Sequence, residues 1–192
     1  QTGGTLVFAG AADPVVIDGA LVSDGESIRV ITQIFETLIN LKPGTTELAP
    51  GLATDWEVSP DALTYTFALR EGVKFHDGTD FNAEAVCFNF DRWYNFKGPL
   101  QSPSASYYYS AFFGGFKNNE SEDLSDPLYK SCEARNPTTA VITLTRPSAS
   151  LLGALVQQSF SIASPKALQE FKADAGTLDE ETGFRPTGTF GT

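Results

Sequence analysis

Positive charge, long apolar runs, methionine and cysteine are all scarce or absent in this sequence. Its 192 residues hold 13 Lys and Arg against 24 Asp and Glu, for a net charge of −11 with the one histidine neutral. Nucleic-acid binders need a basic surface to neutralise phosphates, so this balance argues against nucleic acid as a partner. No apolar run approaches the roughly 20 residues that a membrane-spanning helix requires. Hydrophobic residues still make up 41% of the chain, enough to bury a core in one domain or two small ones.

Methionine is absent, and the chain begins with Gln1. We therefore expect its start to arise from processing or from the choice of the expressed segment, and no signal peptide is present to interpret. The two cysteines, Cys87 and Cys132, could close a disulfide loop that stabilises the fold by about 3–5 kcal/mol in the chain-entropy model. They could equally be two buried free thiols, and the residues alone leave both alternatives open.

The first part of the chain predicts a strand followed by a helix. Residues 5–10 form a short apolar run typical of a strand. From Ser27 onward, apolar residues recur at three- and four-residue spacing, which predicts an amphipathic helix that ends near Asn40. Asp24 is available to cap its start.

A change to alternating apolar and polar residues then predicts a hairpin. Residues 54–58 and 63–70 form its strands, and the turn at 59–62 has Pro at the position that fixes φ. Asp77-Gly78 suits a tight turn with positive φ. After this turn Asn82 can cap a second helix, which residues 83–96 predict by placing apolar side chains on one face.

The remainder shows weaker periodicity. Residues 97–137 predict a long irregular excursion with one short helix, and 139–145 predict a strand. Short helices are expected at 151–157, capped by Ser148, and at 166–172, capped by Ser164-Pro165. The end of the chain, 186–192, carries no strand or helix signal, and we expect the chain to be a fragment of a longer fold.

An aromatic cluster lies inside the irregular excursion: Tyr107, Tyr108, Tyr109, Phe112 and Phe113. This is too much aromatic surface for a solvated loop. Tyrosine suits a cleft wall or an interface because it has an apolar body and a polar tip. Covering the core is the favoured role, and contact with a ligand is the alternative.

Chemistry-bearing motifs are missing. His76 is the only histidine and no G-x-S-x-G motif occurs, so we expect a turn histidine bonded to neighbouring backbone rather than a catalytic base. The cysteines and histidine match no metal-ligand spacing, and the acidic residues of 120–126 are expected to form a solvated loop. No glycine-rich phosphate loop is present. The sequence thus predicts no metal, no cofactor and no enzyme activity, with an acid-catalysed hydrolase as the remaining enzyme alternative.

Three stretches together resemble one protein family. Pro50-Gly51-Leu52-Ala53, Trp56-Glu57-Val58-Ser59 and the run YTFALREGVKFHDG at 65–78 resemble the extracellular solute-binding proteins of family 5. These are the dipeptide- and oligopeptide-binding components of ABC importers. The resemblance extends from about Gly3 to Gly188. One departure is Ala62, where the family usually has Gly in the turn.

The resemblance implies an α/β fold with mixed sheets, of the periplasmic-binding-protein-like class II type. It divides the chain into an incomplete first lobe, residues 1–41 and 161–192, and a small inserted α+β domain, residues 42–160. The second lobe of the family would be absent from these residues.

The resemblance also implies a function. The protein would capture di- and oligopeptides outside the bacterial cytoplasmic membrane, as a monomer, and deliver them to the membrane permease of an ABC importer. Nickel, haem or sugar are alternative ligands in the same family, and a surface module without a transport role is a further alternative. Export would place the protein in the periplasm or on the cell surface as a lipoprotein, and there a Cys87–Cys132 disulfide is favoured.

The ligand contacts implied by the family lie between the first strand and the first helix. They map onto Ser23, Asp24, Gly25 and Glu26, for which a helix cap and solvated turn is the competing role. Tyr108 is a second candidate, from the inserted domain. The family's charged partners for the peptide ends lie largely on the second lobe, so we expect this chain alone to bind peptide weakly or not at all.

Overall fold

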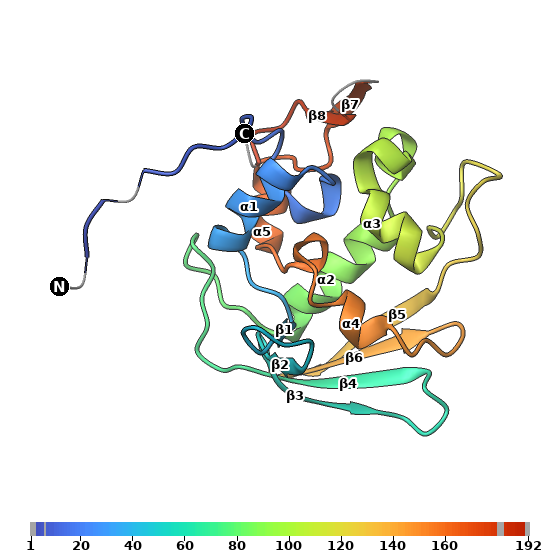
Figure 1. The fold of residues 1–192 in the computed structure, drawn as a ribbon. Helices are drawn as coiled ribbons and strands as arrows, with labels where there is room; N and C mark the ends of the chain where they lie inside the picture. The colour runs from blue at the N-terminus through green and yellow to red at the C-terminus, as the bar shows by residue number, and fades with distance from the viewer. Residues whose placement is uncertain (1–2, 6, 180–182, 191–192) are drawn as a thin grey trace.

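The computed structural model describes residues 3–5, 7–179 and 183–190. A four-stranded antiparallel sheet, with strand order β3-β4-β6-β5, lies at one end of the molecule, and helices cover one of its faces (Figure 1). Two small hairpins, β1-β2 and β7-β8, complete the strands that it describes. The elements in chain order are η1 (Gly19–Leu21), α1 (Gly25–Ile34), β1 (Ile39–Leu41), β2 (Leu48–Pro50), β3 (Ala53–Val58), β4 (Thr64–Leu69), α2 (Ala83–Tyr94), η2 (Gly98–Gln101), α3 (Pro103–Phe113), β5 (Tyr129–Asn136), β6 (Thr139–Leu144), α4 (Leu151–Ala154), η3 (Gln158–Phe160), α5 (Pro165–Glu170), β7 (Gly176–Asp179) and β8 (Gly183–Pro186).

The predicted hairpin forms one half of the large sheet, with β3 at its edge. β3 and β4 pair antiparallel, and β6, also predicted, pairs with the other edge of β4. Tyr65, Phe67 and Leu69 of β4 are buried, because successive side chains in a strand face opposite sides and these three share the core face. The predicted turns are confirmed as well: the Ala62 N–H donates to the Ser59 carbonyl at 2.8 Å, and Gly78 has a φ of 82°.

Helix α2 packs across this sheet and contributes the centre of the core. The Asn82 side chain caps it by accepting from the Ala85 N–H at 2.9 Å, and Phe90 and Trp93 are almost completely buried. Cys87 of α2 and Cys132 of β5 are joined by a disulfide, with Cα atoms 5.1 Å apart. The disulfide therefore links the covering helix to the edge strand of the sheet.

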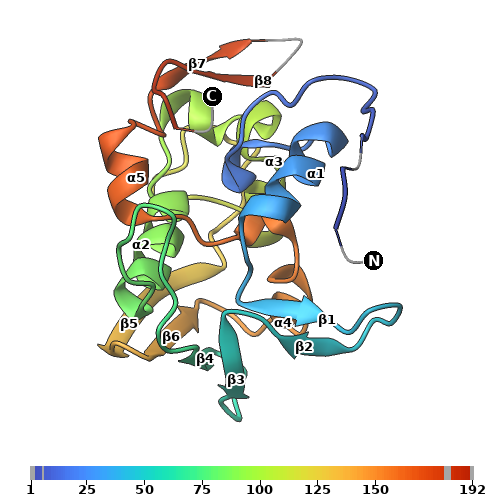
Figure 2. The ribbon, with the colours of Figure 1, turned by 90° about the vertical axis from the view of Figure 1, so that its left-hand side faces the viewer.

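The N-terminal predictions need two corrections. Helix α1 ends at Ile34 instead of near Asn40, because Phe35 is extended and Ile39 enters β1 (Figure 2). The apolar residues that prolong the helical pattern are buried through pairing with residues 48–53. The strand predicted at 5–10 is wrong for its described residues, where Val7 is 89% exposed. A strand needs a partner for its backbone groups, and none of the described residues pairs with this segment.

The excursion at 97–137 is more ordered than predicted. It contains η2, the eleven-residue helix α3 and the edge strand β5. Strand β5 escapes sequence analysis because Lys130, Ser131, Glu133 and Arg135 give it few apolar residues, while pairing with β6 satisfies its backbone. Helix α3 carries the aromatic cluster and places Tyr109 and Phe113 in the core.

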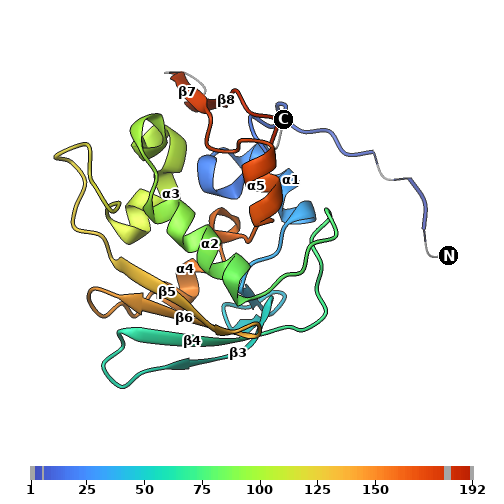
Figure 3. The same cartoon turned by 180° about the vertical axis from the view of Figure 1, so that it is seen from behind.

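Helix α5 and the β7-β8 hairpin lie on the side of the helices away from the large sheet, whereas α4 lies close to the sheet (Figure 3). Helix α5 begins at the predicted Ser164 cap, whose hydroxyl accepts from the Ala167 N–H, but it ends at Glu170. The helix predicted at 151–157 is shorter, since α4 ends at Ala154. The hairpin β7-β8 was not predicted. After β8, residues 187–190 form no helix or strand, and residues 191–192 lie outside the described part of the chain. None of the described helices is long and apolar enough to cross a bilayer.

Candidate functional site

The predicted ligand-facing segment forms the start of helix α1. Asp24 is its N-cap, and its carboxylate accepts from the Ser27 N–H at 2.8 Å. Ser27 is fully buried, and its hydroxyl oxygen accepts from the Val15 N–H at 2.8 Å, so the preceding loop is tied to the helix. Ser23 and Gly25 are exposed, and a Cβ at Gly25 would meet no heavy atom within 4 Å. The backbone at this helix start is thus open to an approaching molecule.

Glu26 completes the segment with a charged group. Its carboxylate lies 3.5 Å from the Arg29 guanidinium one turn along the helix, and the Glu26 side chain is 20% exposed. Arg29 in turn lies over the ring of Phe8 at 5.0 Å. Glu26 therefore has an intramolecular partner, and a ligand cation would compete with Arg29 for it.

Tyr108 lies on helix α3 and not on the segment that contains Asp24. It is half-buried, and its ring contacts Tyr107 at a centroid distance of 5.2 Å in an edge arrangement. Helix α3 packs against η1, the turn that leads into Ser23. The helix that carries Tyr108 therefore packs against the turn that precedes the other predicted contact residues, Ser23–Glu26.

A buried ion network fixes η1. The Arg92 guanidinium of α2 donates to Asp18 at 2.6 Å and to Asp174 at 2.7 Å. Burial opposes the charge on Arg92, but the two carboxylates outweigh it and raise the pKa of the guanidinium. The Asp18 carboxylate also accepts from the Ala20 N–H of η1. The network therefore joins three separate parts of the sequence, around Asp18, Arg92 and Asp174, next to the turn η1 that precedes the predicted ligand-facing segment.

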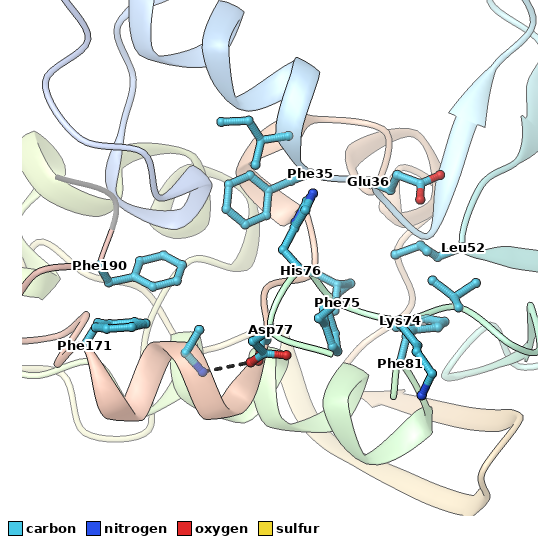
Figure 4. Close-up of a pocket in the computed structure, with 15 residues that line it drawn as sticks. Phe35, Glu36, Leu52, Lys74, Phe75, His76, Asp77, Phe81, Phe171 and Phe190 are labelled. Carbon is cyan, nitrogen blue, oxygen red and sulfur yellow. Dashed lines mark hydrogen bonds between the residues drawn. The ribbon is translucent and has the colours of Figure 1, made fainter. Parts of the chain in front are cut away.

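A pocket of about 390 Å³ lies at the other end of α1 (Figure 4). It is enclosed by the end of α1, the loop before α2, and helix α5. None of the five predicted ligand residues lines it. Most of its wall is apolar, formed by Ile34, Phe35, Leu52, Val73, Phe75, Phe81, Ile162, Ala167, Phe171 and Phe190.

The polar groups of this pocket come mainly from the loop before α2. The Asp77 carboxylate accepts from the Ser164 hydroxyl at 2.5 Å and from the Thr79 hydroxyl and N–H. These hydrogen bonds, with Lys166 nearby, lower the pKa of Asp77 to about 2. His76 lines the pocket and has no hydrogen-bond partner among the described residues, so the predicted bond from this histidine to neighbouring backbone is wrong.

Sequence reasoning missed this pocket because its walls come from four distant stretches, 34–36, 52, 73–81 and 162–190. The one sequence signal for this pocket was the high number of Phe residues, and Phe is equally typical of a protein core. Elsewhere among the described residues, no group of three or more His, Cys, Asp or Glu side chains lies close enough together to hold a metal ion.

Comparison with known proteins gives a consistent result. Residues 47–190 match the model of the bacterial extracellular solute-binding proteins, family 5 (middle part). The dipeptide-binding protein of Escherichia coli K12 is 35% identical over 96% of this chain and 34% of its own length. Haem-binding protein A of Haemophilus influenzae is 36% identical over 96% of the chain and 33% of its own length.

A solved structure agrees with these relatives. The ABC transporter-associated periplasmic binding protein of Helicobacter pylori, in complex with the peptide STSA, superposes with a TM-score of 0.66 at 35% identity. The match covers 85% of this chain and 31% of that protein. The chain thus spans about a third of the length of the relatives that it matches, and the predicted α/β, periplasmic-binding-protein-like fold class is confirmed.

Proposed function

Since the chain belongs to the bacterial extracellular solute-binding proteins of family 5, we propose that its protein captures peptides outside the cytoplasmic membrane and delivers them to the permease of an ABC importer. The observation that carries this proposal is the similarity over 96% of the chain to a dipeptide-binding protein. The likeness to a periplasmic binding protein that holds a tetrapeptide supports the same ligand class. The protein is then a binder and not an enzyme.

The mechanism that we infer is closure of two lobes around the ligand. A ligand can shift the equilibrium between the open and closed arrangements of the lobes only through its higher affinity for the closed state. The permease then recognises that state. Peptides with differing side chains share only their backbone and end groups, so these must supply the common affinity. In this proposal Ser23, Asp24, Gly25 and Glu26 contribute one wall of the cleft, with Tyr108 beside them. The open backbone at Gly25 supports that role.

We also propose the domain division that the family resemblance implies. Residues 1–41 and 161–192 belong to the first lobe, 42–160 form the inserted domain, and the second lobe is not contained in these residues. In this division the ion network joins the two units, because Arg92 of the inserted domain contacts Asp18 and Asp174, one from each part of the first lobe. The protein is monomeric, has no nucleic-acid partner, and is exported as a periplasmic protein or a lipoprotein.

Haem capture is a second candidate, because one relative at 36% identity is a haem-binding protein. Native mass spectrometry of the protein, purified gently from its natural source, distinguishes the two. A series of retained masses that fit peptides of two to five residues supports peptide capture. A single retained porphyrin mass supports haem capture, and a retained solute of any other class contradicts both.

A further inference from the structure

The pocket at the end of α1 is lined by phenylalanine rings, of which Phe35, Phe75 and Phe190 are half-buried and Phe81 is buried. Phe35 and Phe190 lie on one side with ring centroids 6.5 Å apart, and Phe75 and Phe81 lie on the other with centroids 6.1 Å apart. Phe171, at the edge, is 43% exposed, whereas rings such as Phe90 and Phe113 in the core are fully enclosed. A volume of about 390 Å³ is within the range of small-molecule sites and accommodates one substituted ring.

The charged groups of the pocket already have partners within the protein. Glu36 lies 3.4 Å from Arg70, and the Lys74 ammonium lies 2.5 Å from Asp80. Asp77 is held by Ser164 and Thr79. A charged ligand would lose hydration here without gaining an unpaired opposite charge, and that loss is expensive in an apolar site. The pocket therefore favours an uncharged ligand.

One polar group remains available. His76 lies between the two pairs of rings, close to Phe35 in Figure 4. It has no hydrogen-bond or ion-pair partner in the part of the chain that the structure describes. An imidazole can donate or accept a hydrogen bond, so it can orient a hydroxyl carried by a ring.

We propose that this pocket is a binding site for a small uncharged aromatic molecule of the phenol class, whose ring packs against the phenylalanines and whose hydroxyl bonds to His76. The site is separate from Ser23–Glu26 and Tyr108, so it does not depend on the proposed peptide capture.

The test uses 4-methylphenol as the probe and His76 as the reporter. The His76 imidazole C–H resonances are identified in a proton NMR spectrum as those that disappear in His76→Phe. We expect 4-methylphenol to shift them in a saturable manner. The charged probes 4-methylbenzoate and 4-methylbenzylamine, which share the ring, should bind at least about tenfold more weakly. A shift that does not saturate, or equal binding of a charged probe, overturns the proposal.

Variants show whether the probe occupies this pocket. Phe171→Ala should weaken binding by about tenfold through loss of one aromatic contact, and its partial exposure keeps the fold intact. Tyr107→Ala is the matched control, because Tyr107 is 49% exposed and lies outside the pocket. Equal effects of the two variants contradict the site.

A third variant tests the hydrogen bond. His76→Phe retains a ring but should remove the preference for 4-methylphenol over toluene, measured by saturation transfer on the ligand resonances. An unchanged preference contradicts the role of His76. None of these outcomes bears on peptide binding, which is measured separately.

Discussion

The turn between β3 and β4 places a single alanine where the backbone favours glycine. Ala62 has a φ of 55°, in the left-handed region. A side chain in that region costs roughly 1–2 kcal/mol. The family resemblance implies glycine at this position, and the positive φ gives the physical reason for that preference.

We expect Ala62→Gly to increase the free energy of unfolding by about 0.5–1 kcal/mol. Glycine removes the strain, and the greater freedom of the unfolded chain offsets part of the gain. Urea denaturation measures the change. Ala68→Gly, at an exposed position in β4, is the control and should lose about 0.5–1 kcal/mol. Loss of stability in both variants would show that Ala62 is not strained.

A second prediction for a single residue concerns pH. The pKa of Asp77, about 2, lies below its ordinary value of 3.8, because the Ser164 and Thr79 hydrogen bonds favour the carboxylate. The ionised form thus stabilises the fold above about pH 4, and this contribution is lost as the pH falls from about 4 to about 2. We expect Ser164→Ala to raise the pKa of Asp77 towards 3.8 and to reduce that loss.

Carbon-detected NMR titration of the Asp77 carboxyl group measures the shift directly. Ser59→Ala is the matched control, because the Ser59 hydroxyl donates to Asp61 and has no contact with Asp77. An Asp77 pKa that stays near 2 in Ser164→Ala would contradict the assigned cause.

Between elements, the connection most sensitive to mutation is the Arg92 network. The side chains of Arg92 and Asp18 are 4% and 5% exposed, whereas Asp174 is 50% exposed. Removing one partner of a buried pair leaves an uncompensated charge, which costs about 3–5 kcal/mol. A half-exposed pair contributes about 0–1 kcal/mol.

We therefore expect Arg92→Met to reduce the free energy of unfolding by about 3–5 kcal/mol. Asp174→Asn should cost no more than about 1 kcal/mol, and chemical denaturation monitored by tryptophan fluorescence compares the two. Similar losses in both variants would mean that burial of Asp18 does not determine the strength of this network.

Comparison of the helices and strands also shows which of them can be identified from sequence patterns. Strands β4 and β6 and helix α2 were predicted because one side of each faces the core, so their periodicity is strong. Strand β5 and the β7-β8 hairpin were missed, since hydrogen bonds to a neighbouring strand hold them more than their own apolar pattern does. The end of α1 was misplaced for a related reason: burial of Leu38 and Ile39 by strand pairing continues the apolar spacing of a helix.

At the scale of the whole molecule, we expect these 192 residues to bind a dipeptide no more tightly than about 100 µM. They provide one wall of the proposed cleft, and a ligand held on one side retains most of its hydration. Isothermal titration calorimetry measures this, with the dipeptide-binding protein of Escherichia coli as the positive control. A dissociation constant in the micromolar range or below would contradict the one-wall assignment.

The sequence by itself determined the family, the α/β class, the β3-β4 hairpin, the α2 cap and the two turns. These features rest on local backbone preferences, on periodicity, or on a long run of characteristic residues such as 65–78. Only the tertiary structure decided the position of β5, the ion network around Arg92 and the pocket beside His76. Each of these joins residues far apart in the chain, as in the 74-residue separation of Arg92 and Asp18. Such contacts depend on how the elements pack, and packing leaves no local pattern in the sequence.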